Sequence, residues 1–144
     1  MKKILLVVAV CLAAIPAFAQ LNVKASTKSK QIAAFRMGVI TVHLGSHGYY
    51  MALTTNNQFD KSAIFRLGED KEAATKTLDD LMSILESGDT DTAVFVESSP
   101  GKECMLTIQK QLGVPSLWFK VDGCAGSQGL TMGELKKVRD AVNK

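Results

Sequence analysis

Five short segments of the chain alternate hydrophobic and polar residues, which is the pattern of half-buried β-strands. They are residues 32–44, 49–53, 59–67, 104–108 and 117–121. Residues 93–96 are apolar at every position, which predicts an interior strand. Gly45-Ser46-His47-Gly48 separates two of these segments and predicts a hairpin, and Pro100-Gly101 is typical of a type II turn.

The alternation changes phase inside the first segment. Phe35, Met37 and Val39 follow one alternation, and the next apolar residues, from Ile40 onward, follow the other. Because a slip of one residue exchanges the two faces of a strand, we expect a bulge or bend here, assisted by Gly38.

Two segments have the period of amphipathic helices. Residues 69–86 place an apolar residue every three or four positions, and Ser87-Gly88 follows as a stop signal. Thr131-Met132-Gly133-Glu134 has the form of a capping box and predicts the start of a last helix. We expect the residues before it, 122–130, to form a loop.

The order of these elements predicts an α+β fold, with an antiparallel β-sheet and two α-helices packed on one face. Strands followed by a helix occur twice, which suggests a pseudo-repeat. A comparison of Phe65-Arg66-Leu67-Gly68 with Phe119-Lys120-Val121-Asp122 points to the same duplication.

The first 19 residues have the features of a cleaved secretory signal peptide. Lys2 and Lys3 precede an apolar run, and Ala17-Phe18-Ala19 forms a small-x-small cleavage site. We therefore expect a periplasmic or secreted protein, cleaved after Ala19, with no stable membrane insertion after cleavage. Residues 20–30 form a flexible basic arm in this interpretation, and residues 31–144 form a single α+β domain.

Cleavage also changes the charge and the cysteine count. The chain of 144 residues has 17 basic and 14 acidic side chains, and loss of Lys2 and Lys3 reduces the net charge from +3 to +1. A nearly neutral domain is not expected to bind nucleic acid. Loss of Cys11 leaves Cys104 and Cys124, for which we expect a disulfide bond, with two buried free thiols as the alternative.

The sequence contains no recognisable catalytic motif. His43 and His47 are weak candidates for a metal site, because no third ligand can be identified and strand-end histidines are common. We therefore expect no catalytic residues, no metal and no cofactor.

Trp118, Tyr50 and Lys120 are the candidate binding residues. Alternation places Trp118 and Lys120 opposite the core face of their strand, where an exposed aromatic residue often marks a contact surface. The sequence thus favours a small exported non-catalytic binding protein that uses an open sheet face or an edge strand. Its partner is an unknown protein, peptide or glycan.

Two alternatives remain open. One is a small periplasmic hydrolase or metal-dependent enzyme that uses His43 and His47. The other is a structural or inhibitory subunit, including a homodimer formed by pairing of edge strands.

Overall fold

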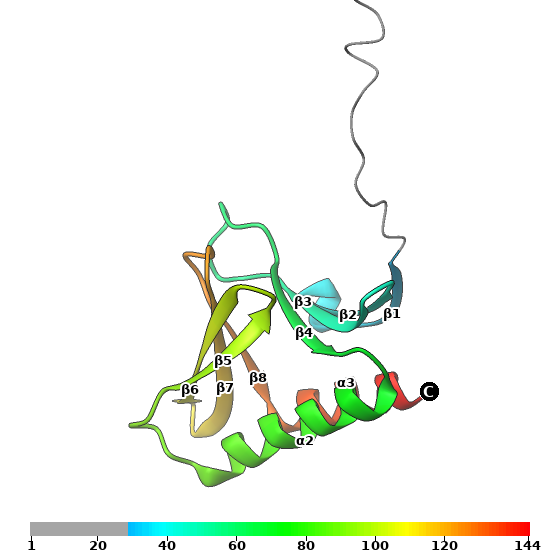
Figure 1. Ribbon diagram of the computed structural model, residues 1–144. Helices are drawn as coiled ribbons and strands as arrows, with labels where there is room; N and C mark the ends of the chain where they lie inside the picture. Colours follow the sequence, from blue (N-terminus) through cyan, green and yellow to red (C-terminus); the bar gives the residue numbers. More distant parts are fainter. Residues whose placement is uncertain (1–28) are drawn as a thin grey trace, which may run out of the picture.

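The computed structural model describes residues 29–144, in which two antiparallel sheets of four strands and two α-helices form an α+β fold (Figure 1). The first sheet contains, in order, β1 (Lys30–Phe35), β2 (Ile40–Gly45), β3 (Gly48–Leu53) and β4 (Ala63–Gly68). The second contains β5 (Val94–Ser99), β6 (Lys102–Gln111), β7 (Val114–Val121) and β8 (Gln128–Thr131). The helices are α2 (Lys71–Ser87) and α3 (Met132–Asn143). The expected signal peptide and most of the basic arm lie outside the described residues.

The order of elements confirms the α+β class and the pseudo-repeat, because four antiparallel strands followed by a helix occur twice. The strands of the two halves correspond differently from the way that the sequence indicated. Phe65 lies on β4, the fourth strand of its sheet, whereas Phe119 lies on β7, the third strand of the other. The equivalent of β7 is β3, so the similarity of the two short sequences does not reflect equivalent positions.

The strands divide between two sheets, where the sequence suggested one. Alternation identifies the buried face of a strand but not the neighbour with which it pairs. Helix α2 separates β4 from β5 in the chain, and these two strands become edges of different sheets, although they lie close to each other.

The change of phase near Gly38 marks a complete break between two strands. A short 3-10 turn, η1 (Arg36–Gly38), connects β1 to β2, and Arg36, Met37 and Gly38 all have positive φ angles of 51°, 52° and 87°. Three left-handed residues in succession reverse the chain, so the expected strand 32–44 becomes a hairpin. Met37 is fully exposed at its tip.

Three further expectations were wrong. Residues 128–131 form the short strand β8, not a loop, because they pair with β7. Strand β5 is an edge strand, not an interior one, and its Phe95 is exposed. Phe59 is also exposed, because β4 begins only at Ala63.

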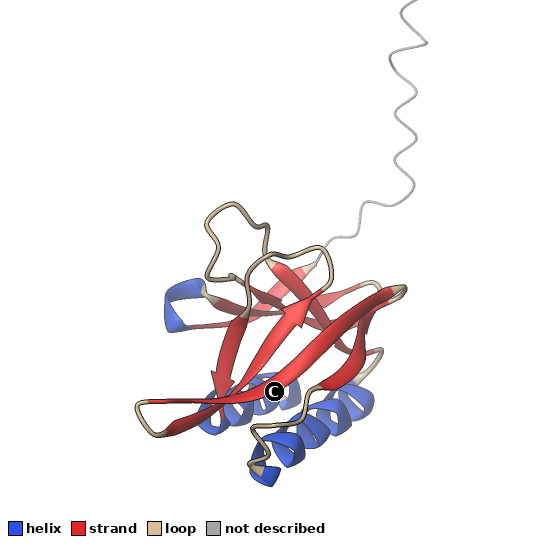
Figure 2. Ribbon diagram, turned by 90° about the vertical axis from the view of Figure 1, so that its left-hand side faces the viewer, coloured by secondary structure: helices blue, strands red, loops and turns tan. Residues whose placement is uncertain are grey.

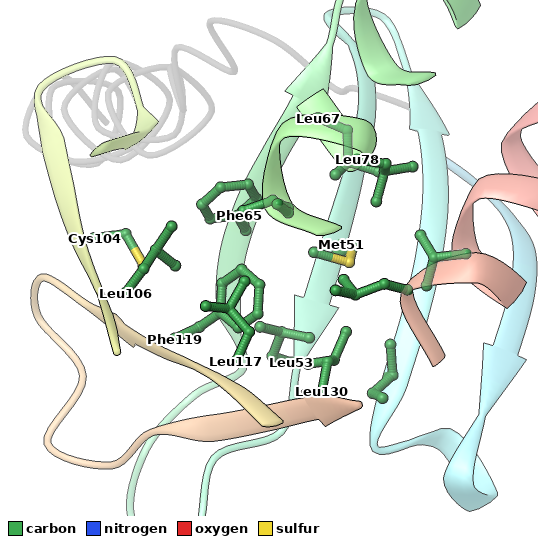
Figure 3. Packing of buried hydrophobic residues seen from close by; sticks show 14 of the residues in the cluster. Met51, Leu53, Phe65, Leu67, Leu78, Cys104, Leu106, Leu117, Phe119 and Leu130 are labelled. Atoms are coloured by element: carbon green, nitrogen blue, oxygen red, sulfur yellow. The ribbon is translucent and has the colours of Figure 1, made fainter. Parts of the chain in front are cut away.

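The inner faces of the sheets and both helices share one hydrophobic core (Figure 3). Phe65 of the first sheet and Phe119 of the second meet in an edge-to-face contact, with ring centroids 5.2 Å apart. Helix α2 packs on β4 and β7, and α3 packs on β1, β2 and β8. Figure 2 shows both helices on the same side of the sheets, as expected. Neither of these two α-helices covers the outer faces of the sheets.

Both helices begin with a side-chain cap, and the cap of α3 is the capping box that the sequence predicts. The Asp70 carboxylate accepts a hydrogen bond from the backbone N–H of Ala73 at the start of α2, and Gly88 ends this helix with a φ of 65°. Thr131 and Glu134 form the capping box of α3. Helix α3 starts directly after β8, and two residues separate α2 from β4.

Candidate functional site

A cavity of about 350 Å³ lies beside the outer face of the first sheet, near the gap between β4 and β5. The β2–β3 hairpin forms one wall and the turn between β5 and β6 forms another. The lining residues that carry its chemistry are Tyr49, Tyr50, Ile64, Arg66, Ser99 and Pro100. Two parts of the chain that are distant in sequence thus form one site.

Gly48 fixes the position of the hairpin wall. Its φ is 97°, which favours glycine, and a Cβ atom here would lie only 2.1 Å from the carbonyl oxygen of Gly68. The hairpin therefore contacts the end of β4 backbone to backbone. This close approach sets the distance from the hairpin to Arg66, which lies on the same strand.

Tyr50 is held in place by stacking. Its ring lies parallel to the ring of His43 on β2, with centroids 5.0 Å apart and an interplanar angle of 5°. The Nε2 atom of His43 lies 2.9 Å from the hydroxyl oxygen of Thr41. This row of side chains gives the cavity a rigid aromatic wall.

Arg66 supplies the charge of the cavity. It is paired with Tyr50 across the two strands, and it is the only Arg, Lys, Asp or Glu among the described lining residues. Its Nη2 atom lies 3.2 Å from the Glu69 carboxylate, which is largely exposed. Its Nε atom is buried and has no hydrogen-bond partner among the described residues. Because almost none of this atom is accessible, a ligand in the cavity would contact Arg66 through the rest of its side chain, which is 32% exposed.

The opposite wall is the Pro-Gly turn that the sequence predicts. Pro100 lines the cavity, and Gly101 has the positive φ of 74° that a type II turn needs. The backbone N–H of Gly101 donates a hydrogen bond of 3.0 Å to the carboxylate of Glu97. This contact ties Glu97 to the turn.

A second hollow of about 310 Å³ adjoins the cavity. Arg66, Ser99 and Pro100 line both hollows. The second hollow also includes Glu69 and Glu97, so it contains two carboxylates where the first has none among its described lining residues.

Trp118 lies on the outer face of the second sheet, as its alternation predicts. The Trp118 side chain is half-buried and lies against Gly129 of β8, where a Cβ atom would come within 2.7 Å of the indole ring. The ring therefore covers the backbone of the neighbouring strand, and part of the surface that a binding platform needs is already occupied.

Lys120 is close to Trp118 on β7, but its ammonium group is engaged within the protein. Its Nζ donates a hydrogen bond to the carbonyl oxygen of Ala125 in the loop that follows β7. Tyr50 lies on the other sheet, in the cavity described above. The structure thus does not unite the three candidate binding residues in one site.

Cys104 and Cys124 are free thiols in the structure. Cys104 is buried, points to the core as expected, and is paired with Val121 across two strands. The backbone N–H of Cys124 donates a hydrogen bond of 3.0 Å to the carbonyl oxygen of Val121, so both cysteines neighbour the same residue. Burial raises the pKa of the Cys104 thiol to about 12. The disulfide bond stays a prediction.

The two histidines have different surroundings. His43 is packed in the sheet between Tyr50 and Thr41, whereas His47 is exposed in the hairpin turn and lines the cavity. Within residues 29–144, no group of three or more His, Cys, Asp or Glu side chains lies in a position to hold a metal ion.

The structure thus describes a small α+β protein with a cavity large enough for a small ligand, formed where two sheet edges approach each other. Comparison of the chain with protein-family models, with curated proteins and with solved structures found no match. None of the helices within the described part of the chain is long and apolar enough to cross a membrane.

Sequence reasoning identified Tyr50 but missed the other main residues of the cavity. The alternation of β4 places Arg66 opposite the core, which was a visible signal. The Pro100 turn that faces it comes after helix α2 in the chain, and no local pattern connects the two.

Proposed function

We propose that this is an exported, non-catalytic binding protein whose ligand carries an apolar group and a carboxylate. The ligand occupies the cavity between the β2–β3 hairpin and the Pro100 turn. The feature that carries this proposal is Arg66, whose side chain is 32% exposed and which is the only Arg, Lys, Asp or Glu among the described lining residues. The sequence of residues 1–19 supports export.

The size and lining of the cavity favour a small organic group. Ligand sites commonly have volumes of about 300–1,000 Å³ and combine apolar walls with a few polar groups. Here Tyr50, Ile64 and Pro100 provide apolar surface. Because Tyr50 is stacked on His43, it needs little reordering when a ligand binds.

The guanidinium of Arg66 favours a carboxylate. An arginine presents several N–H donors in a plane, and two of them match the two oxygens of a carboxylate. Glu69 contacts only Nη2, at 3.2 Å, and its side chain is 84% exposed. A ligand carboxylate with partial burial in the cavity would therefore compete well with this surface contact.

Isothermal titration calorimetry with a simple probe tests the proposal. We expect 3-phenylpropionate to bind the purified protein and 3-phenyl-1-propanol, which lacks the carboxylate, to bind more weakly. The Arg66→Gln variant should lose about tenfold to a hundredfold in affinity for the acid, as expected for a charged hydrogen bond.

Arg139→Gln is the matched control, because Arg139 is also a partly exposed arginine paired with an acid, Asp79, but does not line the cavity. This variant should bind 3-phenylpropionate as the wild type does. Equal binding of acid and alcohol, or equal affinity of the Arg66→Gln and wild-type proteins for the acid, would contradict the proposal.

A further inference from the structure

The cavity and the second hollow meet at the same three residues, Arg66, Ser99 and Pro100. We infer that together they form one groove that binds an extended peptide of mixed charge. A carboxylate of the peptide pairs with Arg66, and a basic side chain lies over Glu97 and Glu69. This inference rests on the proposed function and names the class of ligand.

The position of the groove favours an extended peptide. Strand β4 is the last strand of the first sheet and β5 is the first strand of the second, so among residues 29–144 each has one edge without a strand partner in its own sheet. These two strands lie close together, and residues of both line the groove. Edge strands have backbone N–H and C=O groups that can bind an extended chain.

The acidic side chains of the groove lie on one side only. Arg66 lies where the two hollows meet, and the described lining residues of the second hollow add Glu69 and Glu97, whereas those of the first include no carboxylate. The hydrogen bond from Gly101 holds the Glu97 side chain beside the turn. A ligand with a negative charge alone would use one end and be repelled at the other, so a peptide with both charges fits better.

Two probe peptides test this arrangement, acetyl-Lys-Ser-Phe-Glu-amide and acetyl-Gln-Ser-Phe-Glu-amide, which differ only in the basic side chain. We expect the first peptide to bind the mature protein roughly two- to fivefold more tightly than the second, the range for a partly exposed ion pair. The Glu97→Gln variant should remove most of this difference, because Gln still accepts the hydrogen bond from Gly101 but has no charge.

Glu86→Gln is the control, since Glu86 is an exposed residue of α2 outside both hollows. It should leave the preference for the lysine peptide intact. If 3-phenylpropionate binds but the two peptides bind equally, or if Glu97→Gln retains the preference, the peptide inference is wrong and the binding site stands. If neither the acid nor either peptide binds, the proposed function itself fails.

Discussion

The carboxylate of Asp60 accepts a hydrogen bond of 2.6 Å from the backbone N–H of Gly126, in a loop of the other repeat. The neighbouring N–H of Ala125 donates a second bond of 3.1 Å to the same carboxylate. Asp60 lies between β3 and β4, and Gly126 lies between β7 and β8, so equivalent connections of the two repeats are bound to each other. These two loops meet at the end of the molecule opposite the helices (Figures 1 and 2).

This contact predicts a specific dependence of stability on pH. The hydrogen bonds from Gly126 and Ala125 lower the pKa of Asp60. Because the folded-state pKa lies below the unfolded value, the stabilisation is present above about pH 4 and is lost as the pH falls through the folded value. Urea unfolding should therefore show Asp60→Asn less stable than the wild type at pH 7, with the difference shrinking toward pH 3.

Asp80→Asn provides the comparison for this experiment, because Asp80 is exposed on α2 and makes no hydrogen bond from its side chain among the described residues. We expect its stability to follow the wild type across the same range. A gap between Asp60→Asn and wild type that stays constant from pH 7 to pH 3 would show that ionisation of Asp60 does not contribute.

The hairpin wall of the cavity depends on Gly48. Gly48→Ala should destabilise the protein by roughly 2 kcal/mol or more, because its positive φ disfavours alanine and the new methyl group would clash with the Gly68 carbonyl. Thermal unfolding measures the effect. Gly133→Ala in α3 is the control, since its Cβ would meet open space, and it should stabilise the helix by about 0.5–1 kcal/mol. Equal melting temperatures for the two variants would contradict the close approach of Gly48.

Cys104 and Cys124 should form a disulfide bond when the mature protein is purified without reductant. The bond closes a loop of about 20 residues, and its reduction should lower the free energy of unfolding by about 3 kcal/mol. A thiol assay in denaturant should detect no free thiol before reduction and two after it.

Detection of two free thiols in the unreduced protein would exclude the bond. In that case Cys124 should react with a thiol reagent faster than Cys104 in the folded state, because Cys104 is fully buried and its pKa is raised to about 12.

Glu134 joins the start of α3 to the turn after β1. The Oε2 atom of its carboxylate accepts a hydrogen bond of 2.6 Å from Nη2 of Arg36. The same atom accepts one of 2.8 Å from the backbone N–H of Thr131. Burial opposes its ionisation, but the bonds from Thr131 and Arg36 outweigh this effect and lower its pKa. Glu134→Gln should cost about 1–2 kcal/mol in chemical unfolding, the usual range for loss of a helix cap and a charged bond.

Glu72→Gln is the comparison for Glu134, since Glu72 lies in the first turn of α2 but forms no ion pair among the described residues. Its loss should cost only a few tenths of a kcal/mol through the helix dipole. If the two substitutions lowered the free energy of unfolding by similar amounts, the contacts of Glu134 with Arg36 and Thr131 would add nothing to the general effect of an acid at a helix start.

The sequence predicted the elements that depend on contacts between residues close together in the chain. The apolar period of α2, its end at Gly88 and the Thr131-Glu134 capping box each depend on contacts inside one helix. The alternation of β7 likewise identified Leu117 and Phe119 as core residues and Trp118 as an outer residue. Strand β8 escaped prediction because its four residues are too few to show a period.

The sequence by itself determined the α+β class, the buried face of most strands and the repeated order of strands and helix, because hydrophobic period and capping act over short distances. Only the tertiary structure decided that the strands form two sheets and that Arg66 faces Pro100 across the gap between them. Pairing of strands and the approach of two edges depend on packing between residues far apart in the chain. The candidate site lies where two sheet edges approach each other. Alternation along a single strand does not predict which distant segment of the chain packs beside it.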